Sequence, residues 1–418
     1  MNPDAISDPP DAVVRVPGSK SLTQRAMVAA ALASGTSRIR NALMADDTRH
    51  LAEGLGMLGA FIEQTPDGFI VTGTGGALKR AEGEALFLGN NGTALRFLTA
   101  VASLGRGRYV LTGDKRLCER PVGPLVEALA SMGVDIRCTN HCPPVEIHAN
   151  GLKGGAVTLT DIESSQYVSA LLLCGPYTAR GIDLSLEGSV VSAPYIDLTL
   201  RVMEAFGAKV LRTGAGRFQV GTHNLYGARD YVVEGDASSA SYFYLAAALT
   251  GRKIRVRGIT RQSAQGDIRL LDIFETLGCH VESGEDWVDI TGGKLAQGDF
   301  TFDLGDMPDM VPTVGVLAAF RNGRTTLTNV AHLRIKESNR LAAMAAELGR
   351  AGIRARELSD GLEVEGGRMK PANIETYNDH RIAMSFAVAS RVVAGISIYD
   401  RKCVDKSFPG FWKELAGL

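Results

Sequence analysis

Six alanine-rich stretches of the chain are apolar around nearly the whole circumference of a helix, and strand-like runs separate them. The stretches read AMVAAALA, FLTAVAS, YVSALLL, YFYLAAAL, TVGVLAAF and IAMSFAVA. A helix that is apolar all round is typical of a protein interior, because a surface helix keeps one polar face. The pattern therefore predicts six buried helices, each followed by a strand.

A glycine stands between each buried helix and the strand that follows it. These glycines are 72, 74, 70, 72 and 72 residues apart: Gly35, Gly107, Gly181, Gly251, Gly323 and Gly395. A second series lies between them: Gly59, Gly133, Gly207, Gly278 and Gly352. Glycine adopts the left-handed conformation at little cost, so we expect both series to cap the C-termini of helices. The nearly equal spacing indicates six copies of one unit with the order strand, helix, strand, helix, strand, strand.

Six such units in 418 residues predict two domains of three units each, since one hydrophobic core rarely serves a chain of this length. We expect the break between the two domains near Glu234–Asp236, where the fourth unit begins. The predicted fold class is α/β.

Composition argues against several classes of protein. The net charge is −1 and no basic run occurs, so we do not expect nucleic acid as a partner. The longest apolar stretches are shorter than the roughly 20 residues of a membrane span, so we expect no membrane association. The first residues, MNPDAISDPP, lack the pattern of a secretion signal. These features predict a cytoplasmic protein.

The six cysteines are scattered along the chain, and no two of them form a CxxC pair. This pattern favours reduced thiols that pack in the interior over a disulfide framework. Cys138, His141 and Cys142 form a cluster that could bind zinc, but a second pair of ligands is missing. We therefore predict neither a metal nor a cofactor.

The N-termini of the buried helices carry residues suited to an anion site. A helix N-terminus offers unpaired N–H groups and a partial positive charge, which favour phosphate and carboxylate groups. Cations are disfavoured there unless an anion shares the position, so Lys20, Arg25, Arg96 and Arg381 indicate a ligand rather than ordinary caps. The residues Asp236–Ser239 before the fourth helix are equally consistent with capping, through Ser238 or Ser239.

Two familiar phosphate-binding motifs do not fit. The segment PGSKS at residues 17–21 lacks the spacing of a P-loop, and the glycines of residues 71–76 lack that of a dinucleotide fold. A further charged run, RIKESNR, is expected to open a helix on which Lys336 and Arg340 share a face near Glu337. A merely solvated helix face is the alternative for this run.

Eight segments of the chain resemble the 5-enolpyruvylshikimate-3-phosphate (EPSP) synthase family and occur in that family's order between Val13 and Lys406. They are PGSKSLTQR, LGNNGTALR, ERPVGPL, SSQYVSALL, SAPYID, VEGDASSASYF, RIKESNRL and YNDHRIAM. The resemblance implies two domains, each with three βαβαββ units in pseudo-threefold symmetry (an inverse α/β barrel), which close on the substrates about a two-stranded hinge. It implies that residues 19–234 form one domain and that residues 1–18 with residues 235–418 form the other, so that the chain crosses between them near residues 18–19 and 234–236. It also implies a monomeric enzyme.

The family reaction belongs to the shikimate pathway of chorismate synthesis. It transfers the enolpyruvyl group of phosphoenolpyruvate to the 5-hydroxyl of shikimate 3-phosphate and releases phosphate, through a non-covalent tetrahedral intermediate. The two small-molecule substrates are therefore the expected partners. The resemblance makes the domain of residues 19–234 the main binding site for shikimate 3-phosphate. The other domain would contribute the base and cations that bind phosphoenolpyruvate.

The resemblance also assigns residues to each substrate. For shikimate 3-phosphate they are Lys20, Ser21, Arg25, Ser164, Ser165, Gln166, Ser192, Tyr195, Asp309 and Lys336. For phosphoenolpyruvate they are Lys20, Gly92, Arg120, Gln166, Arg340, Arg381 and Lys406. Asp309 is the candidate base for the attacking hydroxyl, and Lys20 and Glu337 are both candidates for proton transfer at the methylene carbon.

Three positions depart from the family's common pattern. Asn91 stands where alanine is frequent, Phe97 where proline is frequent, and His332 where asparagine is frequent. Because the first two lie beside Gly92, which borders the expected phosphoenolpyruvate site, the sequence does not predict the response to the phosphoenolpyruvate mimic glyphosate.

Other classes of protein fit the sequence less well. The related transferase that acts on UDP-N-acetylglucosamine carries a reactive cysteine where this chain has Lys115. A catalytically silent anion-binding protein would not need the acid and base residues. An RNA-end-modifying enzyme would be expected to carry more positive charge and aromatic stacking residues.

Overall fold

The computed structural model describes residues 9–418 except residues 215 and 223, and within this range the chain forms two compact units. The unit that we call the N-terminal unit contains Gly18–Glu234 and His332–Asn339. The C-terminal unit contains the chain up to Pro17, Gly235–Ala331 and Arg340–Leu418. The boundaries at Pro17 and Glu234 lie at the expected crossings, whereas the inclusion of His332–Asn339 in the N-terminal unit differs from the expected division.

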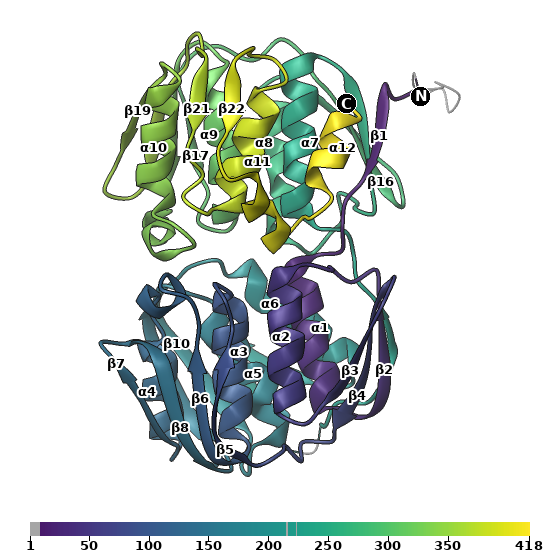
Figure 1. Ribbon diagram of the computed structural model, residues 1–418, viewed down its shortest axis with the longest axis vertical. Helices are drawn as coiled ribbons and strands as arrows, with labels where there is room; N and C mark the ends of the chain where they lie inside the picture. Colours follow the sequence, from purple (N-terminus) through teal and green to yellow (C-terminus); the bar gives the residue numbers. More distant parts are fainter. Residues whose placement is uncertain (1–8, 215, 223) are drawn as a thin grey trace. The chain divides into compact units, whose positions relative to one another are not determined.

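The centre of the N-terminal unit consists of helices that contact one another (Figure 1). They are α1 (Lys20–Leu32), α3 (Gly92–Ser103) and α5 (Gln166–Cys174). Every residue of α1 from Leu22 onward is buried, in agreement with its all-round apolar sequence. The accompanying helices are amphipathic and bury one face: α2 (Asp46–Met57), α4 (Gly123–Ser131) and α6 (Pro194–Ala205).

The sheets of this unit share one pairing pattern in the part of the chain that the structure describes: a parallel pair is extended by two antiparallel strands. The first has the order β13 (Asp230–Val232), β2 (Ser34–Arg40), β4 (Gly68–Thr74), β3 (Phe61–Thr65). The second has β5 (Ala81–Phe87), β6 (Arg106–Thr112), β8 (Cys142–Asn150), β7 (Asp135–Thr139). The third has β9 (Gly155–Ile162), β10 (Ile182–Val190), β12 (Arg217–Val220), β11 (Val210–Gly214).

The C-terminal unit repeats this plan. Its mutually contacting buried helices are α7 (Ala237–Thr250), α9 (Val311–Ala319) and α11 (His380–Ala389). The remaining helices are α8 (Leu270–Thr276), α10 (Arg340–Arg350) and α12 (Phe411–Ala416). One sheet has the order β1 (Ala12–Arg15), β14 (Lys253–Arg257), β16 (Trp287–Thr291), β15 (His280–Ser283). Another has β17 (Phe300–Asp303), β18 (Arg324–Thr328), β20 (Leu362–Glu365), β19 (Arg354–Glu357).

The sixth repeat is incomplete. Within the described residues its sheet holds only β21 (Ala372–Ile374) and β22 (Ile396–Ile398), and a 3-10 turn at Arg401–Lys406 and helix α12 follow. The expectation of six complete units is therefore wrong for the last one, because no antiparallel strands extend the β21–β22 pair within the described residues. The α/β class itself is confirmed.

The strands that open the first and fourth repeats are exchanged. Strand β1 pairs in parallel with β14 of the fourth repeat, and β13 pairs in parallel with β2 of the first. Apart from the passages on either side of His332–Asn339, the chain passes between the units at Pro17–Gly18 and at Glu234–Gly235 as a result of this exchange. Backbone hydrogen bonds hold both crossings: Ser19 N donates to Glu234 O at 2.8 Å, and Asp236 N donates to Pro17 O at 2.8 Å.

The eleven glycines of the two spaced series all have positive φ angles, between 72° and 113°. The predicted left-handed conformation is thus confirmed, but its expected place at a helix C-cap is wrong for several of them. Gly251 caps α7 directly with a φ of 72°, whereas Gly35 lies inside β2, one residue after its start. The glycine there turns the chain as it enters the strand.

Candidate active site

In the N-terminal unit, the buried helices α1, α3 and α5 begin with residues that the sequence assigned to substrates: Lys20, Gly92 and Gln166. The ammonium of Lys20 pairs with a carboxylate oxygen of Asp47 at 3.0 Å, where Asp47 is almost fully buried. The sequence analysis missed Asp47, because acids are common in the first turn of any helix and nothing local distinguishes this one. Lys20 is thus held in place by the second helix of its own repeat.

Arg25 is a fully buried cation whose hydrogen-bond partners are neutral. Its guanidinium donates to the Thr199 hydroxyl at 2.7 Å, to the Ser21 and Tyr195 carbonyls at 2.9 and 3.2 Å, and to the Ser169 hydroxyl at 3.3 Å. Within the described residues no ion pair joins it to a carboxylate. Burial lowers the pKa of Arg25 to about 10, because the charged form loses its hydration. Such a group favours the approach of an anion.

Acceptors without partners lie near the start of α5 and before α6. The buried oxygens Gln166 Oε1 and Ser192 Oγ have no hydrogen-bond partner within the described part of the chain. Gln166 Nε2 donates to Thr93 Oγ1 at 3.0 Å, and Gln166 N donates to Ser164 Oγ at 3.3 Å. Ser165, also buried, precedes Gln166. Because buried polar atoms are normally hydrogen-bonded, these oxygens indicate a place for a polar ligand.

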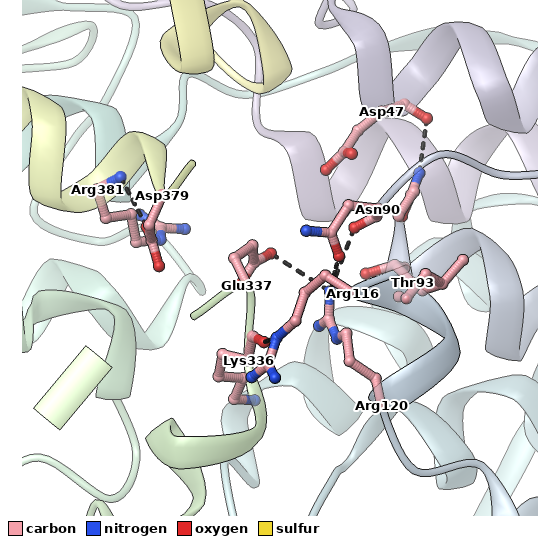
Figure 2. A network of polar contacts seen from close by, with 12 residues as sticks. Asp47, Asn90, Thr93, Arg116, Arg120, Lys336, Glu337, Asp379 and Arg381 are labelled. Carbon is pink, nitrogen blue, oxygen red and sulfur yellow. Dashed lines mark hydrogen bonds and ion pairs between the residues drawn. The ribbon is translucent and has the colours of Figure 1, made fainter. Parts of the chain in front are cut away.

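Gly92 lies in close contact with two arginines. A Cβ at this position would lie 2.6 Å from Arg120 Cζ and 2.4 Å from Arg96 Nη1, so any side chain would displace them. Arg120 is buried, donates to the Asn90 backbone and side-chain oxygens at 3.2 Å, and lies 3.7 Å from a Glu337 carboxylate oxygen (Figure 2). Asn91 caps α3, since its side chain accepts from Ala94 N at 2.9 Å.

Arg96 contacts two backbone carbonyls and an aromatic ring. It donates to the Gly92 carbonyl at 2.9 Å and to the Pro121 carbonyl, and its guanidinium lies 5.6 Å from the centre of the Tyr167 ring. These contacts tie the start of α3 to the residue that follows Arg120.

The RIKESNR segment does not form the helix that its sequence predicted. A 3-10 turn covers Ala331–Ile335, and α10 begins only at Arg340, so Lys336 and Arg340 do not share a helix face. The cause is Arg116, which donates to the carbonyls of Lys336 at 3.0 Å and Arg334 at 3.2 Å (Figure 2). In a helix the Lys336 carbonyl would accept from the Arg340 N–H instead. Arg116 thereby holds Lys336 and Glu337 in the N-terminal unit, and no local sequence signal identified it.

The C-terminal unit brings Asp309, Arg340 and Arg381 together. Asp309 lies in the 3-10 turn Pro308–Met310, and its two carboxylate oxygens accept from Arg340 Nη1 at 2.7 Å and from Arg381 Nη2 at 2.6 Å. Asp379, which the sequence analysis gave no role, accepts from Arg340 Nε at 2.8 Å and from the Arg381 N–H at 3.0 Å (Figure 2). Lys406 ends the 3-10 turn Arg401–Lys406 and is half-buried.

The start of α7 resolves the open question of Asp236–Ser239. The cap is Asp236, whose side chain accepts from Ser239 N at 2.7 Å. The hydroxyl of Ser238 donates to the buried carboxyl of Asp267 instead. Burial, together with the charge of Asp309, raises the pKa of Asp267 to about 7. Capping by Ser238 or Ser239 is therefore wrong, and a second buried carboxyl group lies near Asp309.

The remaining sequence alternatives concern metals and membranes. In the part of the chain that the structure describes, no group of three or more His, Cys, Asp or Glu side chains is arranged to hold a metal ion. The same residues contain no helix that combines the length and apolar character needed to cross a membrane.

Comparison with known proteins gives full-length matches. The family described as EPSP synthase (3-phosphoshikimate 1-carboxyvinyltransferase) matches residues 6–415. A protein of Nostoc punctiforme named 3-phosphoshikimate 1-carboxyvinyltransferase is 40% identical over 98% of this chain and 96% of its own length. A protein of the same name from Sulfurovum sp. is 42% identical over 97% of this chain and 96% of its own length.

Solved structures give a matching fold. EPSP synthase from Acinetobacter baumannii matches with a TM-score of 0.78 and 29% identity, over 97% of this chain and 95% of that one. The enolpyruvyl transferase NikO from Streptomyces tendae matches with a TM-score of 0.78 over 98% of this chain and 95% of that one. Its identity of 20% shows a shared fold alone.

Proposed function

The chain belongs to the EPSP synthase (3-phosphoshikimate 1-carboxyvinyltransferase) family, and from this premise we propose how its residues divide the work of enolpyruvyl transfer. It is a transferase of the shikimate pathway that moves the enolpyruvyl group of phosphoenolpyruvate to the 5-hydroxyl of shikimate 3-phosphate and releases phosphate. We further propose that it works in the cytoplasm as a monomer, without a metal or a cofactor.

We also infer the finer architecture. Each unit forms an inverse α/β barrel, in which sheets surround a bundle of buried helices related by pseudo-threefold symmetry. The support is the mutual contact of α1, α3 and α5 in one unit and of α7, α9 and α11 in the other. The repeated pairing pattern of the sheets supports it further.

The N-terminal unit provides the binding site for shikimate 3-phosphate. The observation that carries this assignment is the buried guanidinium of Arg25, which neutral groups surround. We assign the substrate phosphate to Arg25 together with the residues Ser164 and Ser165, and the ring hydroxyls to the oxygens of Gln166 and Ser192. The full set assigned to this substrate is Lys20, Ser21, Arg25, Ser164, Ser165, Gln166, Ser192, Tyr195, Asp309 and Lys336.

Arginines provide most of the positive charge that binds phosphoenolpyruvate. Their planar forks match phosphate and carboxylate groups through paired hydrogen bonds. The set assigned to this substrate is Lys20, Gly92, Arg120, Gln166, Arg340, Arg381 and Lys406. Gly92 leaves room beside Arg120 that a larger residue would remove. Each of the two sets contains residues of both units, so we expect substitutions in either unit to impair catalysis.

The chemistry consists of an addition followed by an elimination. Asp309 removes the proton of the 5-hydroxyl while the hydroxyl oxygen bonds to C2 of phosphoenolpyruvate. In the same addition the methylene carbon takes up a proton. In the tetrahedral intermediate that results, C2 carries both the new ether oxygen and the phosphate. Loss of a proton from the methyl group then restores the double bond as phosphate leaves. Lys20 and Glu337 are the candidates for proton transfer at this carbon.

Phosphate release tests this function. The purified enzyme is mixed with phosphoenolpyruvate and either shikimate 3-phosphate or UDP-N-acetylglucosamine. We expect release with shikimate 3-phosphate and no release above background with the sugar nucleotide. Release with the sugar nucleotide only, or with neither acceptor, would contradict the proposal.

A further inference from the structure

The arginines assigned to phosphoenolpyruvate in the C-terminal unit already hold an anion that belongs to the protein. Asp309 accepts from both Arg340 and Arg381, at 2.7 and 2.6 Å, through a different oxygen for each. A carboxylate bridging two guanidiniums has the charge and the geometry that an anionic substrate would present to the same groups. Asp309, the proposed base, thus occupies the hydrogen-bond donors of Arg340 and Arg381 that are proposed to bind the substrate.

The two carboxylates of this cluster differ in how firmly they are fixed. Asp379 is fully buried, caps α11 and binds Arg340 through Nε, so its departure would leave buried donors without partners. The side chain of Asp309 is 23% exposed and lies on a short 3-10 turn, where water can replace its partners. Arg340 therefore has one permanent carboxylate on Nε and one exchangeable carboxylate on Nη1.

We propose that Asp309 is the internal ligand of the Arg340–Arg381 site in the empty enzyme, that the phosphoenolpyruvate anion displaces it, and that Asp379 is the positioning residue that keeps Arg340 in place during the exchange. This inference rests on the proposed function, because it names the substrate group that takes the arginines. No covalent bond is made or broken in the exchange.

The exchange has a chemical consequence for the reaction. A carboxylate held by two guanidiniums accepts a proton poorly, because opposite charges favour its ionised form. When an external anion takes these guanidiniums, the carboxylate loses both counter-charges and becomes a stronger base. Binding of phosphoenolpyruvate therefore activates the group that must deprotonate the 5-hydroxyl, and the base stays weak while its second substrate is absent.

Anion affinity tests the exchange without any turnover. Calorimetric titration with inorganic phosphate, in the absence of shikimate 3-phosphate, compares the wild-type enzyme with Asp309→Asn, Asp379→Asn and Asp306→Asn. Each variant removes one negative charge from the same unit, so the long-range change in potential is matched. Asp306 is the control because its carboxylate pairs with Arg269 and lies outside the cluster.

We expect Asp309→Asn to bind phosphate about tenfold more tightly, because no ionised competitor must leave the arginines. We expect Asp379→Asn to bind it more weakly, because Arg340 loses its fixed partner, and Asp306→Asn to match the wild type. The opposite signs at two carboxylates on one arginine distinguish exchange from a general effect of charge.

Equal or weaker phosphate binding by Asp309→Asn would overturn the exchange, and this holds even if Asp379→Asn fails to fold. The proposed function fails by a separate result, the absence of wild-type turnover with shikimate 3-phosphate. A wild-type enzyme that is active, paired with an Asp309→Asn variant of unchanged affinity, would remove only the inference drawn here.

Discussion

Replacement of Arg25 by methionine separates substrate binding from stability. Arg25 is charged in both the folded and the unfolded chain at neutral pH. Burial lowers its pKa from 12.5 to about 10. Because each pKa unit corresponds to about 1.4 kcal/mol, the charge destabilises the folded protein by about 3 kcal/mol at any pH below that value. Arg25→Met removes this penalty.

The same change also removes hydrogen bonds to Thr199, Ser21, Ser169 and Tyr195, which contribute about 1 kcal/mol each. The Tyr195 carbonyl loses its hydrogen bond from Arg25 but still accepts one from the Thr199 hydroxyl at 2.9 Å, so it is not left unpaired. The two effects nearly cancel. We expect the free energy of unfolding to change by less than about 2 kcal/mol.

The affinity for shikimate 3-phosphate should respond very differently. Truncation of one partner in a buried charged pair costs at least about 2 kcal/mol, so we expect the dissociation constant to rise at least about 30-fold. Urea denaturation measures the stability, and calorimetric titration measures the affinity. An unchanged affinity would exclude Arg25 from the site, and a large parallel loss of stability would make its role structural.

Arg321 is a matched control in the other unit. It is also a buried guanidinium, but it donates to the loop carbonyls of Ala296 and Gly298 and to the Thr325 hydroxyl. Arg321→Met leaves these carbonyls unsatisfied, at about 1–3 kcal/mol each. We therefore expect this variant to lose stability and to keep its affinity for shikimate 3-phosphate.

Two further predictions concern Asp267 and Lys20. Since the pKa of Asp267 rises from 3.8 to about 7 on folding, the folded chain keeps a proton that the unfolded chain releases, and the free energy of unfolding should fall as the pH rises through that window. Asp267→Asn should flatten this dependence in urea titrations at pH 5 and pH 8, and an unaltered slope would contradict the assignment. Lys20→Met should lower turnover at least about 100-fold without unfolding the protein, whereas the exposed control Lys115→Met should not, and near-normal turnover would remove Lys20 from the mechanism.

The sequence predicted those features of the fold that depend on local pattern. The buried helices follow from the all-round apolar stretches, and the repeat follows from evenly spaced glycines with left-handed angles. The exchange of β1 and β13 was not readable in the same way. The pairing of a parallel strand depends on contacts that are distant in sequence. The residues of β1 therefore give no local indication that β1 pairs with β14.

The site shows the same division. The helix argument singled out Lys20, because an anion-binding residue has a physical reason to stand at the start of a buried helix, and the resemblance added Gly92 and Gln166. The partners that orient them were not identifiable. Arg116 donates a hydrogen bond to the Lys336 carbonyl, in a segment that was predicted to be helical. Asp47 lies on a different helix from Lys20 and pairs with it. Such contacts arise only when the chain is folded.

Some of the cations at helix N-termini pair with carboxylates of the protein itself. The sequence analysis required an external anion to explain them, yet the protein supplies carboxylates of its own. Asp47 faces Lys20, and Asp309 faces Arg340 and Arg381. Arg25 differs, since the described chain offers it neutral partners, and this contrast singles out the position at which the phosphate of the substrate should bind most directly.

Enolpyruvyl transfer is best observed by following the carbon and phosphorus atoms of phosphoenolpyruvate through the complete reaction. Enzyme, shikimate 3-phosphate and carbon-13-labelled phosphoenolpyruvate are mixed in deuterated water and followed by carbon and phosphorus nuclear magnetic resonance. We expect one enol ether at the 5-hydroxyl and one phosphate for each phosphoenolpyruvate consumed, with deuterium entering the methylene carbon through the methyl intermediate. Pyruvate as the carbon product, or an enol ether with no deuterium at that carbon, would contradict it.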